Sequence, residues 1–250
     1  MLRFQSILKA GAMRSIAPLV LALILMLTWT SRPVAAKTHN VQIPAVVPFA
    51  TARFDLLSTE VTQGRPHLSY GSGMIRLPDQ SWQWIADTTT IDTTRAVQIG
   101  PQIWISLDGG IQWPVSGFLP YGNTQNLNLT RQVAQIADNA YARVRLGAEP
   151  VRGVSTTHFQ LWLRGADVLA IGGNSLNVSA LSRDFLTLFQ HSTYKYDLWI
   201  GADGRLYQQN IVWIAPPPIP GSFPSLQQIS TLVTYYDFND PSITITAPSR

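Results

Sequence analysis

The sequence predicts an α+β domain built on one continuous antiparallel β-sheet, in the manner of a sandwich or a barrel, with two amphipathic helices. Short segments of alternating apolar and polar residues recur from position 51 onward, and turn residues separate them. The helical pattern appears in only two segments, about 128–140 and 175–190. Strands and helices do not alternate, so parallel βαβ units are excluded.

Residues 1–36 predict a signal peptide. Basic residues precede an apolar run at 16–29, and small residues at 34–36 offer a cleavage site after Ala36. An uncleaved membrane anchor is the rival interpretation, but a span needs about 20 apolar residues. This run is shorter and contains Pro18. We therefore predict cleavage after Ala36 and an exported protein.

The charge balance changes when the leader is removed. The chain has 18 basic and 14 acidic residues, and four of the basic ones are Arg3, Lys9, Arg14 and Arg32. No acidic residue lies in the leader, so the mature chain has 14 of each sign. A nucleic-acid partner requires a basic patch, and this composition does not provide one.

The chain contains no cysteine. A mature part of roughly 200 residues is long enough to bury a core without disulfides. Without a cysteine there is no site for the lipid that anchors a lipoprotein. The sequence thus predicts a protein of the periplasm, the cell envelope or the secreted fraction that is not lipid-anchored.

Residues 37–50 contain Pro44 and Pro48 and predict an extended linker or edge segment before a domain at 51–250. Within that domain, Phe54 and Leu56 alternate with polar residues and predict the first strand. Further strands are predicted at about 71–77, 81–86, 96–100, 102–107 and 111–113, the last after a turn at 108–110.

Both helical segments carry an apolar stripe on one side. Leu129, Val133 and Ile136 recur at helical spacing in the first. The second follows Asn174-Ser175, which can cap a helix, and its stripe consists of Val178, Leu181, Phe185, Leu188 and Phe189. We expect both helices to cover the sheet.

Four further strands are predicted outside the hairpin at 194–213. At 141–146 the residues expected to be buried are Ala142, Val144 and Leu146, and at 158–164 they are Phe159, Leu161 and Leu163. Residues 215–221 are rich in proline and predict a loop. The closing strands carry Leu232, Thr234, Tyr236 and Phe238, then Ile243 and Ile245.

A hairpin at 194–213 is the clearest local signal. Tyr194, Tyr196, Leu198 and Ile200 share one strand face, and Asp203-Gly204 predicts a tight primed turn with positive φ at its centre.

This hairpin contains W-I-x-x-D-G-R-L at 199–206, and other short motifs follow the same order along the chain. They are Gly71-x-Gly73 with Pro78-Asp79, Ile99-Gly100 to Trp104 with Gly110-x-x-Trp113, Gly153-Val154 with Thr157-His158-Phe159, and Tyr236-Asp237-Phe238 with Pro241, Ile243 and Ala247-Pro248. Together they resemble the LolA-like and LppX/LprG-like lipid and lipoprotein carriers of the bacterial cell envelope.

The resemblance implies a strongly curved antiparallel sheet, a half-barrel, whose concave side is apolar and closed by helices. An apolar cavity of that kind can stay dry and accept a hydrocarbon ligand. The absence of cysteine departs from the lipidated members of the family. The implied protein is a carrier or sensor of amphiphiles. Its partner would be a lipid or an acylated protein, with contact to the membrane surface.

The helical stripes and strand faces together predict the residues of this cavity and its lid. They are Phe54, Leu56, Val133, Ile136, Leu161, Leu163, Leu181, Phe185, Phe189, Leu198 and Ile200.

An exported carbohydrate-binding or adhesive β-domain is the alternative. Trp104, Trp162 and Trp199 fall on the strand face opposite the apolar one. They are either cross-strand packing partners or an exposed aromatic platform for sugar rings.

A hydrolase has the least support. The four histidines lie in different elements without metal-ligand spacing, and no G-x-S-x-G motif is present. His158 predicts a hydrogen-bonded structural histidine. Asp55, Asp197 and Asp237 would need to be about 5–10 Å apart for glycosidase chemistry. We predict no catalytic residue, no metal and no cofactor.

Overall fold

The structure is a computed structural model, and its described residues are 41–77, 80–87, 93–100, 102–106, 108–113, 115–118, 129–172, 183–216 and 226–249. They contain one antiparallel sheet of eleven strands. The strands are β1 (Thr51–Thr62), β2 (Arg65–Arg76), β3 (Gln80–Asp87), β4 (Thr93–Ile99), β5 (Gln102–Ser106), β6 (Val115–Phe118), β7 (Ala142–Val151), β8 (Val154–Arg164), β9 (Thr193–Gly201), β10 (Leu206–Ile214) and β11 (Leu226–Tyr236).

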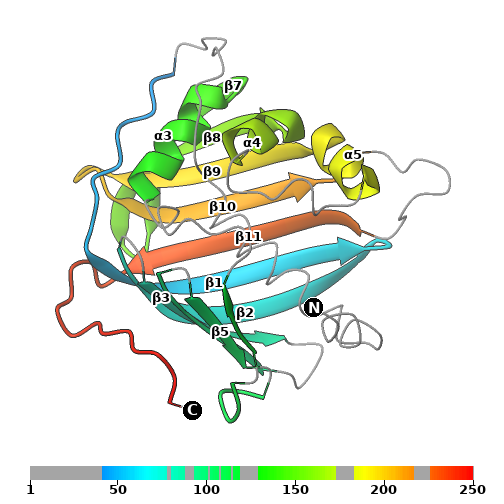
Figure 1. Cartoon of the computed structure of the whole chain (residues 1–250). Helices are drawn as coiled ribbons and strands as arrows, with labels where there is room; N and C mark the ends of the chain where they lie inside the picture. Colours follow the sequence, from blue (N-terminus) through cyan, green and yellow to red (C-terminus); the bar gives the residue numbers. More distant parts are fainter. Residues whose placement is uncertain are drawn as a thin grey trace.

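The strand order is β6-β5-β4-β3-β2-β1-β11-β10-β9-β8-β7. Each half of the sheet is therefore a meander of sequence neighbours, and the β1–β11 pair joins the two halves. In Figure 1 the sheet bends so that β3 and β5 turn away from the plane of β8 to β11.

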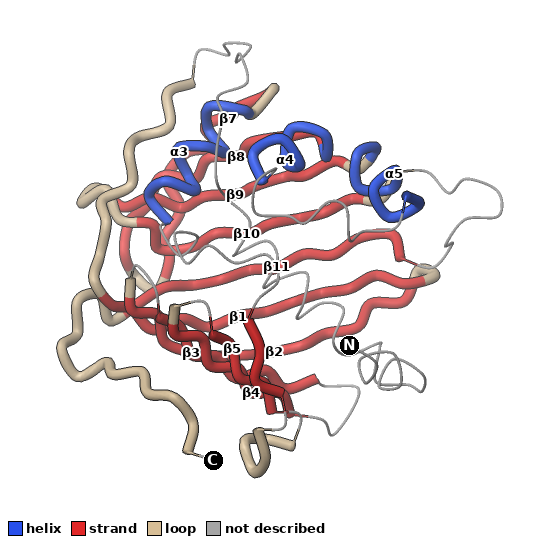
Figure 2. Tube along the Cα trace, viewed as in Figure 1, coloured by secondary structure: helices blue, strands red, loops and turns tan. Residues whose placement is uncertain are grey.

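Three described helices, α3 (Leu129–Asn139), α4 (Gly165–Gly172) and α5 (Arg183–His191), lie together at the β7–β9 end of the sheet (Figure 2). Their apolar residues share one buried cluster with one face of the sheet, which we call the inner face. The predicted fold class, a single curved antiparallel sheet covered on its concave side by helices, is confirmed. Within the described residues no helix is both long and apolar enough to cross a bilayer.

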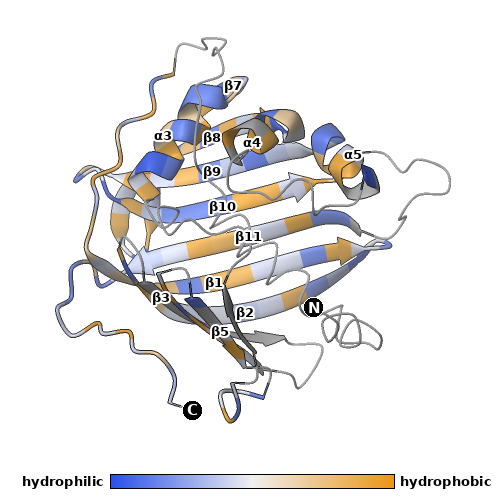
Figure 3. Cartoon of the chain, viewed as in Figure 1, coloured by the Kyte–Doolittle hydropathy of each residue, from blue (hydrophilic) through white to orange (hydrophobic). Residues whose placement is uncertain are grey.

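Side-chain alternation separates the two faces of the sheet. On β8 the buried residues are Phe159, Leu161 and Leu163, as predicted, and on β9 both predicted tyrosines are fully buried. Figure 3 shows apolar residues recurring along β8 to β11 and on the helices. The core is thus a layer between the helices and the inner face.

The prediction for β7 was wrong. Val144 and Leu146 are 43% and 51% exposed and not buried. The pairing register explains this, because Arg143 lies opposite the buried Leu161 and Val144 lies opposite Gln160. Val144 therefore points to the outer face, and Leu146 lies at the β-bulge between Arg145 and Gly147.

The closing strand also buries the other set of residues. Ile229, Thr231, Val233 and Tyr235 are buried on β11, whereas the residues that the sequence analysis named there, Leu232, Thr234, Tyr236 and Phe238, are half-buried. The predicted last strand at Ile243 and Ile245 was wrong, because both residues lie in a segment without strand structure, although both are buried.

Two more differences concern element boundaries. The structure has no strand at 111–113 and places β6 at Val115–Phe118. The helix α4 was not predicted. In the second predicted helix, only 183–190 lies within the described residues, as part of α5.

The turn at 108–110 is confirmed. Backbone amides of Ile111 and Gln112 each donate to Asp108 Oδ1 at 3.0 Å. Hydrogen bonds from Gln112 and Ser106 lower the pKa of the Asp108 carboxyl. Gly109 and Gly110 supply the positive φ values, 74° and 95°.

The turn of the β9–β10 hairpin differs from the predicted primed turn. The amide of Gly204 donates to the carbonyl of Gly201 at 2.9 Å, and the amide of Gly201 donates to the carbonyl of Arg205 at 2.9 Å. The loop therefore has three residues, and the positive φ falls on Gly204 alone, at 76°. This is the pattern of a type I turn followed by a glycine bulge.

Residues 41–50 run without regular structure along the domain. Val46 and Phe49 are buried in the core cluster, and the amide of Val47 donates to the carbonyl of Gly204 at 2.9 Å. The signal peptide at 1–36 and its boundary lie outside the described residues, as do residues 217–221 of the proline-rich loop.

Candidate functional site

The core between the helices and the inner face gathers the predicted cavity and lid residues whose side chains the structure describes. Each is at most 5% exposed. They are Phe54, Leu56, Val133, Ile136, Leu161, Leu163, Phe189, Leu198 and Ile200, and all belong to one core cluster. Leu181 lies outside the described residues, as does the side chain of Phe185, whose backbone is part of α5.

These residues form two groups on the sheet. The β8 and β9 residues lie next to one another, with Leu161 opposite Tyr196 and Phe159 opposite Leu198. Phe54 and Leu56 lie on β1 and pair with Tyr235 and Val233 on β11. Strands β10 and β11 therefore separate the two groups.

The side chains that fill this gap were missing from the predicted site. Ile211 lies opposite both Tyr196 and Thr231, and Trp213 lies opposite both Tyr194 and Ile229. The alternation of Gln209, Ile211 and Trp213 is visible in the sequence and could have identified this face. When Ile211 and Trp213 are included, the buried residues of the inner face extend without a gap from β1 to β8.

Buried tyrosines form part of this face. Burial and then the neighbouring Tyr196 raise the pKa of Tyr194 well above its usual range, and burial also raises the pKa of Tyr196. Burial raises the pKa of Tyr235, although the hydrogen bond from Gln209 Nε2 at 2.8 Å acts in the opposite direction. All three phenols are therefore neutral at physiological pH.

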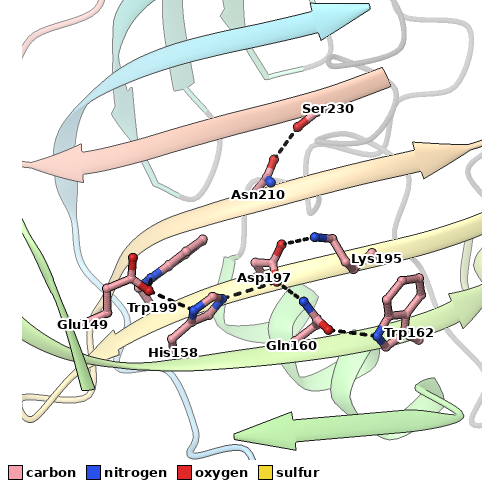
Figure 4. Close-up of polar contacts among 9 residues, drawn as sticks. All are labelled: Glu149, His158, Gln160, Trp162, Lys195, Asp197, Trp199, Asn210 and Ser230. Carbon is pink, nitrogen blue, oxygen red and sulfur yellow. Dashed lines mark hydrogen bonds and ion pairs between the residues drawn. The ribbon is translucent and has the colours of Figure 1, made fainter. Parts of the chain in front are cut away.

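The outer face of β8 and β9 carries a polar network, which Figure 4 shows. We call Glu149, His158, Gln160, Lys195 and Asp197 the outer cluster. Asp197 Oδ2 lies 3.0 Å from Lys195 Nζ, and Asp197 Oδ1 accepts from Gln160 Nε2 at 2.9 Å. His158 bridges two carboxylates, with Nε2 3.3 Å from Asp197 Oδ1 and Nδ1 2.9 Å from Glu149 Oε2.

These contacts confirm that His158 is hydrogen-bonded, as predicted. The Asp197 side chain is only 4% exposed, and its oxygens are occupied by neighbouring donors. Asp55 lies three strands away, on β1, which corresponds to about 14 Å. This separation is too large for the two to act as a glycosidase pair.

Asp55 and Asp237 have partners of their own. Arg152 Nη1 lies 2.9 Å from Asp55 Oδ2, and Arg53 Nε lies 3.3 Å from Asp237 Oδ2. Among the described residues, no group of three or more histidine, aspartate or glutamate side chains could hold a metal ion.

The three tryptophans do not form an exposed platform. Trp199 is 7% exposed, stacks on His158 and donates from Nε1 to Glu149 Oε2 at 2.9 Å. Trp162 is half-buried and donates to Gln160 Oε1 at 3.2 Å. Trp104 is half-buried on β5, at the far side of the sheet. Packing on the sheet, one of the two alternatives, is confirmed for Trp199.

A surface hollow of about 510 Å³ lies between the C-terminal segment and the sheet. Met74, Val97 and Trp113 line it, together with residues 244–249. Met74 pairs with Arg53 on β1, which lies on the outer face, and with Trp82 on β3. Val97 pairs with Trp82 from the other side, so Met74 and Val97 both lie on the outer face. This hollow is therefore separate from the helix-covered inner face.

Comparison with solved structures finds similar chains. Mycobacterium tuberculosis lipoprotein LppX is 15% identical with a TM-score of 0.43, and the match covers 79% of this chain and 90% of LppX. LprF from Mycobacterium bovis is 10% identical with a TM-score of 0.46, covering 81% and 90%. A LolA superfamily protein from Nitrosomonas europaea is 10% identical with a TM-score of 0.33, covering 80% and 90%.

No family model matches the chain, and no curated protein matches it. Each of the three TM-scores is below 0.5.

Proposed function

We propose that the chain is an exported, non-enzymatic carrier or sensor that holds acyl chains of a lipid or an acylated protein against the inner face. The observation that carries this proposal is the single buried apolar cluster shared by α3, α5 and the sheet. It contains every described residue of the predicted cavity and lid.

The energetics favour an acyl ligand. Burying a methylene group contributes about 0.8 kcal/mol, so a chain of about a dozen carbons offsets the ordering cost of binding. The inner-face residues of this cluster are buried. Entry of a chain therefore requires α3 or α5 to move away from the sheet, as a lid does.

The outer cluster fits a structural role better than a catalytic one. Its carboxylates contact Lys195, Gln160, His158 and Trp199, and it contains no serine, cysteine or threonine beside the histidine. We therefore propose that the protein is not an enzyme. Contact with a membrane surface belongs to the same proposal, because a carrier must take up and release its cargo there.

The test is titration of the mature protein with fluorescent fatty acids of increasing chain length. Affinity should rise with length, by at most about fourfold per methylene. Organic extraction of protein purified from its native source, followed by mass spectrometry, should release a lipid. If no acyl probe of any length binds saturably, the proposal is wrong.

Val133 and Val144 offer a matched pair of variants. Val133 lies 2% exposed in α3, and Val144 lies 43% exposed on the outer face of β7. Val133→Asp should abolish probe binding, because it places an unpaired charge in the cluster. Val144→Asp should leave binding unchanged. If Val133→Asp fails to fold by circular dichroism, Val133→Thr makes the same comparison with little change in volume.

A further inference from the structure

Four polar side chains on the inner face are buried without a hydrogen-bond partner among the described residues. The atoms are Ser58 Oγ, the Tyr194 hydroxyl, Trp213 Nε1 and Thr231 Oγ1. None of these residues is more than 4% exposed. We call this set the polar stripe.

The polar stripe crosses four neighbouring strands. Tyr194 on β9 lies opposite Trp213 on β10, and Thr231 on β11 lies opposite Ser58 on β1. Trp213 pairs with Ile229, which is two residues from Thr231 on the same face. The four groups therefore form a diagonal band across the middle of the sheet.

Within the described part of the chain, the hydroxyl groups on the outer face of β11 have hydrogen-bond partners, unlike that of Thr231 on its inner face. Ser230 Oγ donates to Asn210 Oδ1 at 2.8 Å, and Thr234 Oγ1 donates to Gln208 Oε1 at 3.0 Å. Hydroxyl groups of β11 on the outer face thus have partners, whereas Thr231 on the inner face has none among the described residues. Buried polar groups without a partner are rare in folded proteins and reduce stability.

The chemistry of the polar stripe suits a neutral acceptor. The Trp213 N–H only donates, and the hydroxyls can donate as well. Burial keeps the Tyr194 phenol protonated, with its pKa well above the usual range. Glu60 lies on the same face of β1, two residues from Ser58, and its charge disfavours an anionic group there. Arg143, a cation on the inner face, lies on β7 beyond β8.

We propose that the polar stripe binds the neutral oxygen acceptors of an acyl ester, so that the protein selects esterified acyl chains over free fatty acids. This inference rests on the proposed function, since it assigns the polar end of the same ligand.

The test is displacement of a fluorescent acyl probe by methyl palmitate, palmitate and hexadecane. The ester should displace the probe at a concentration at least about fivefold lower than the alkane, as one net hydrogen bond would give. Palmitate should be weaker than the ester. Thr231→Val and Trp213→Phe should each reduce the preference for the ester over the alkane by about fivefold.

Stability distinguishes a binding role from a structural one. Thr231→Val removes a buried group that lacks a partner, so the Tm of the free protein should stay the same or rise. The matched control is Thr234→Val on the outer face, which breaks a hydrogen bond and should lower Tm without changing displacement.

The failures are distinguishable. If ester and alkane displace the probe equally, or if Thr231→Val weakens all three competitors alike and lowers Tm, the inference is wrong and acyl binding stands. If the probe itself does not bind, the proposed function fails and the inference fails with it.

Discussion

Lys195 and Asp197 lie two residues apart on β9, and Lys195 Nζ is 3.0 Å from Asp197 Oδ2 on the outer face. The Asp197 side chain is 4% exposed and that of Lys195 is 25% exposed. The carboxylate is thus held out of water by its neighbours, and its charge is balanced mainly by this one contact.

Lys195→Met should therefore destabilise the protein by about 3 kcal/mol, the lower end for a broken buried pair, because Gln160 and His158 still contact the carboxylate. Arg152→Met is the control, since Arg152 and Asp55 are about half exposed. An exposed pair contributes about 0–1 kcal/mol. Urea unfolding of both variants measures the difference, and equal losses would contradict the assignment of Asp197 as a buried charge.

Gly204 and Gly64 allow two effects of a substitution to be separated. One is the backbone strain of a non-glycine residue at positive φ, and the other is the steric clash of its Cβ atom with a neighbour. Both have positive φ, 76° and 73°. A Cβ atom on Gly204 would lie 2.7 Å from Val47 Cγ2, whereas one on Gly64 would meet nothing within 4 Å. Gly64→Ala should cost about 1 kcal/mol, and Gly204→Ala about 2–3 kcal/mol. Gly204→Val should cost more.

The double variant Val47→Ala/Gly204→Ala tests the origin of that excess. Val47→Ala removes the clashing methyl group, so the cost of Gly204→Ala in this background should approach that of Gly64→Ala. Chemical denaturation of the four proteins gives the coupling. If the two glycine substitutions cost the same from the outset, Val47 does not restrict the turn.

Alkaline pH should unfold the protein through its buried tyrosines. The pKa values of Tyr194, Tyr196 and Tyr235 are raised above the usual value of 10.0 by burial. The folded state keeps these protons while the unfolded state loses them. The free energy of unfolding therefore keeps its full value below pH 10. It falls as the pH rises further, by about 1.4 kcal/mol per pH unit for each tyrosine.

Phenolate absorbance and circular dichroism should show that these tyrosines ionise together with unfolding. Tyr196→Phe should make the decline with pH shallower by the contribution of one group. If tyrosine ionisation is complete near pH 10 while the fold persists, the three phenols are not sealed from water.

The exported form should begin at Lys37. Small residues at 34–36 follow the apolar run of the leader, which is the arrangement that signal peptidases cleave. N-terminal sequencing of the protein from its export compartment gives the answer directly. Finding Met1 there would show that the leader is retained.

Strand periodicity was sufficient for strands that pair with a neighbour on both sides. Leu161 and Leu163 on β8 and Leu198 and Ile200 on β9 lie on the buried face, as their alternation predicts. On the edge strand β7 the same argument failed, because burial there depends on the register with β8. The sequence contains the alternation but not the register.

Other features depend on contacts that no local pattern expresses. The α4 segment is apolar on all sides, with Val168, Leu169 and Ile171 close together, and so lacks a helical stripe. Ser58 and Thr231 read as ordinary polar residues of their strands. Only the β1–β11 pairing places them opposite each other on the buried face.

The β1–β11 pair also determines how the sheet can form. The hydrogen bond between Tyr236 and Asp55 joins residues 181 positions apart, whereas nearly all other strand pairs join sequence neighbours. The two meanders can form as the chain becomes available, but they can pair with each other only after β11, which follows the other ten strands in the sequence, has been synthesised. Closing so long a loop is slow, and until then both β1 and β11 present unpaired edges. The pairing of β1 with β11 is therefore the folding step that competes with aggregation.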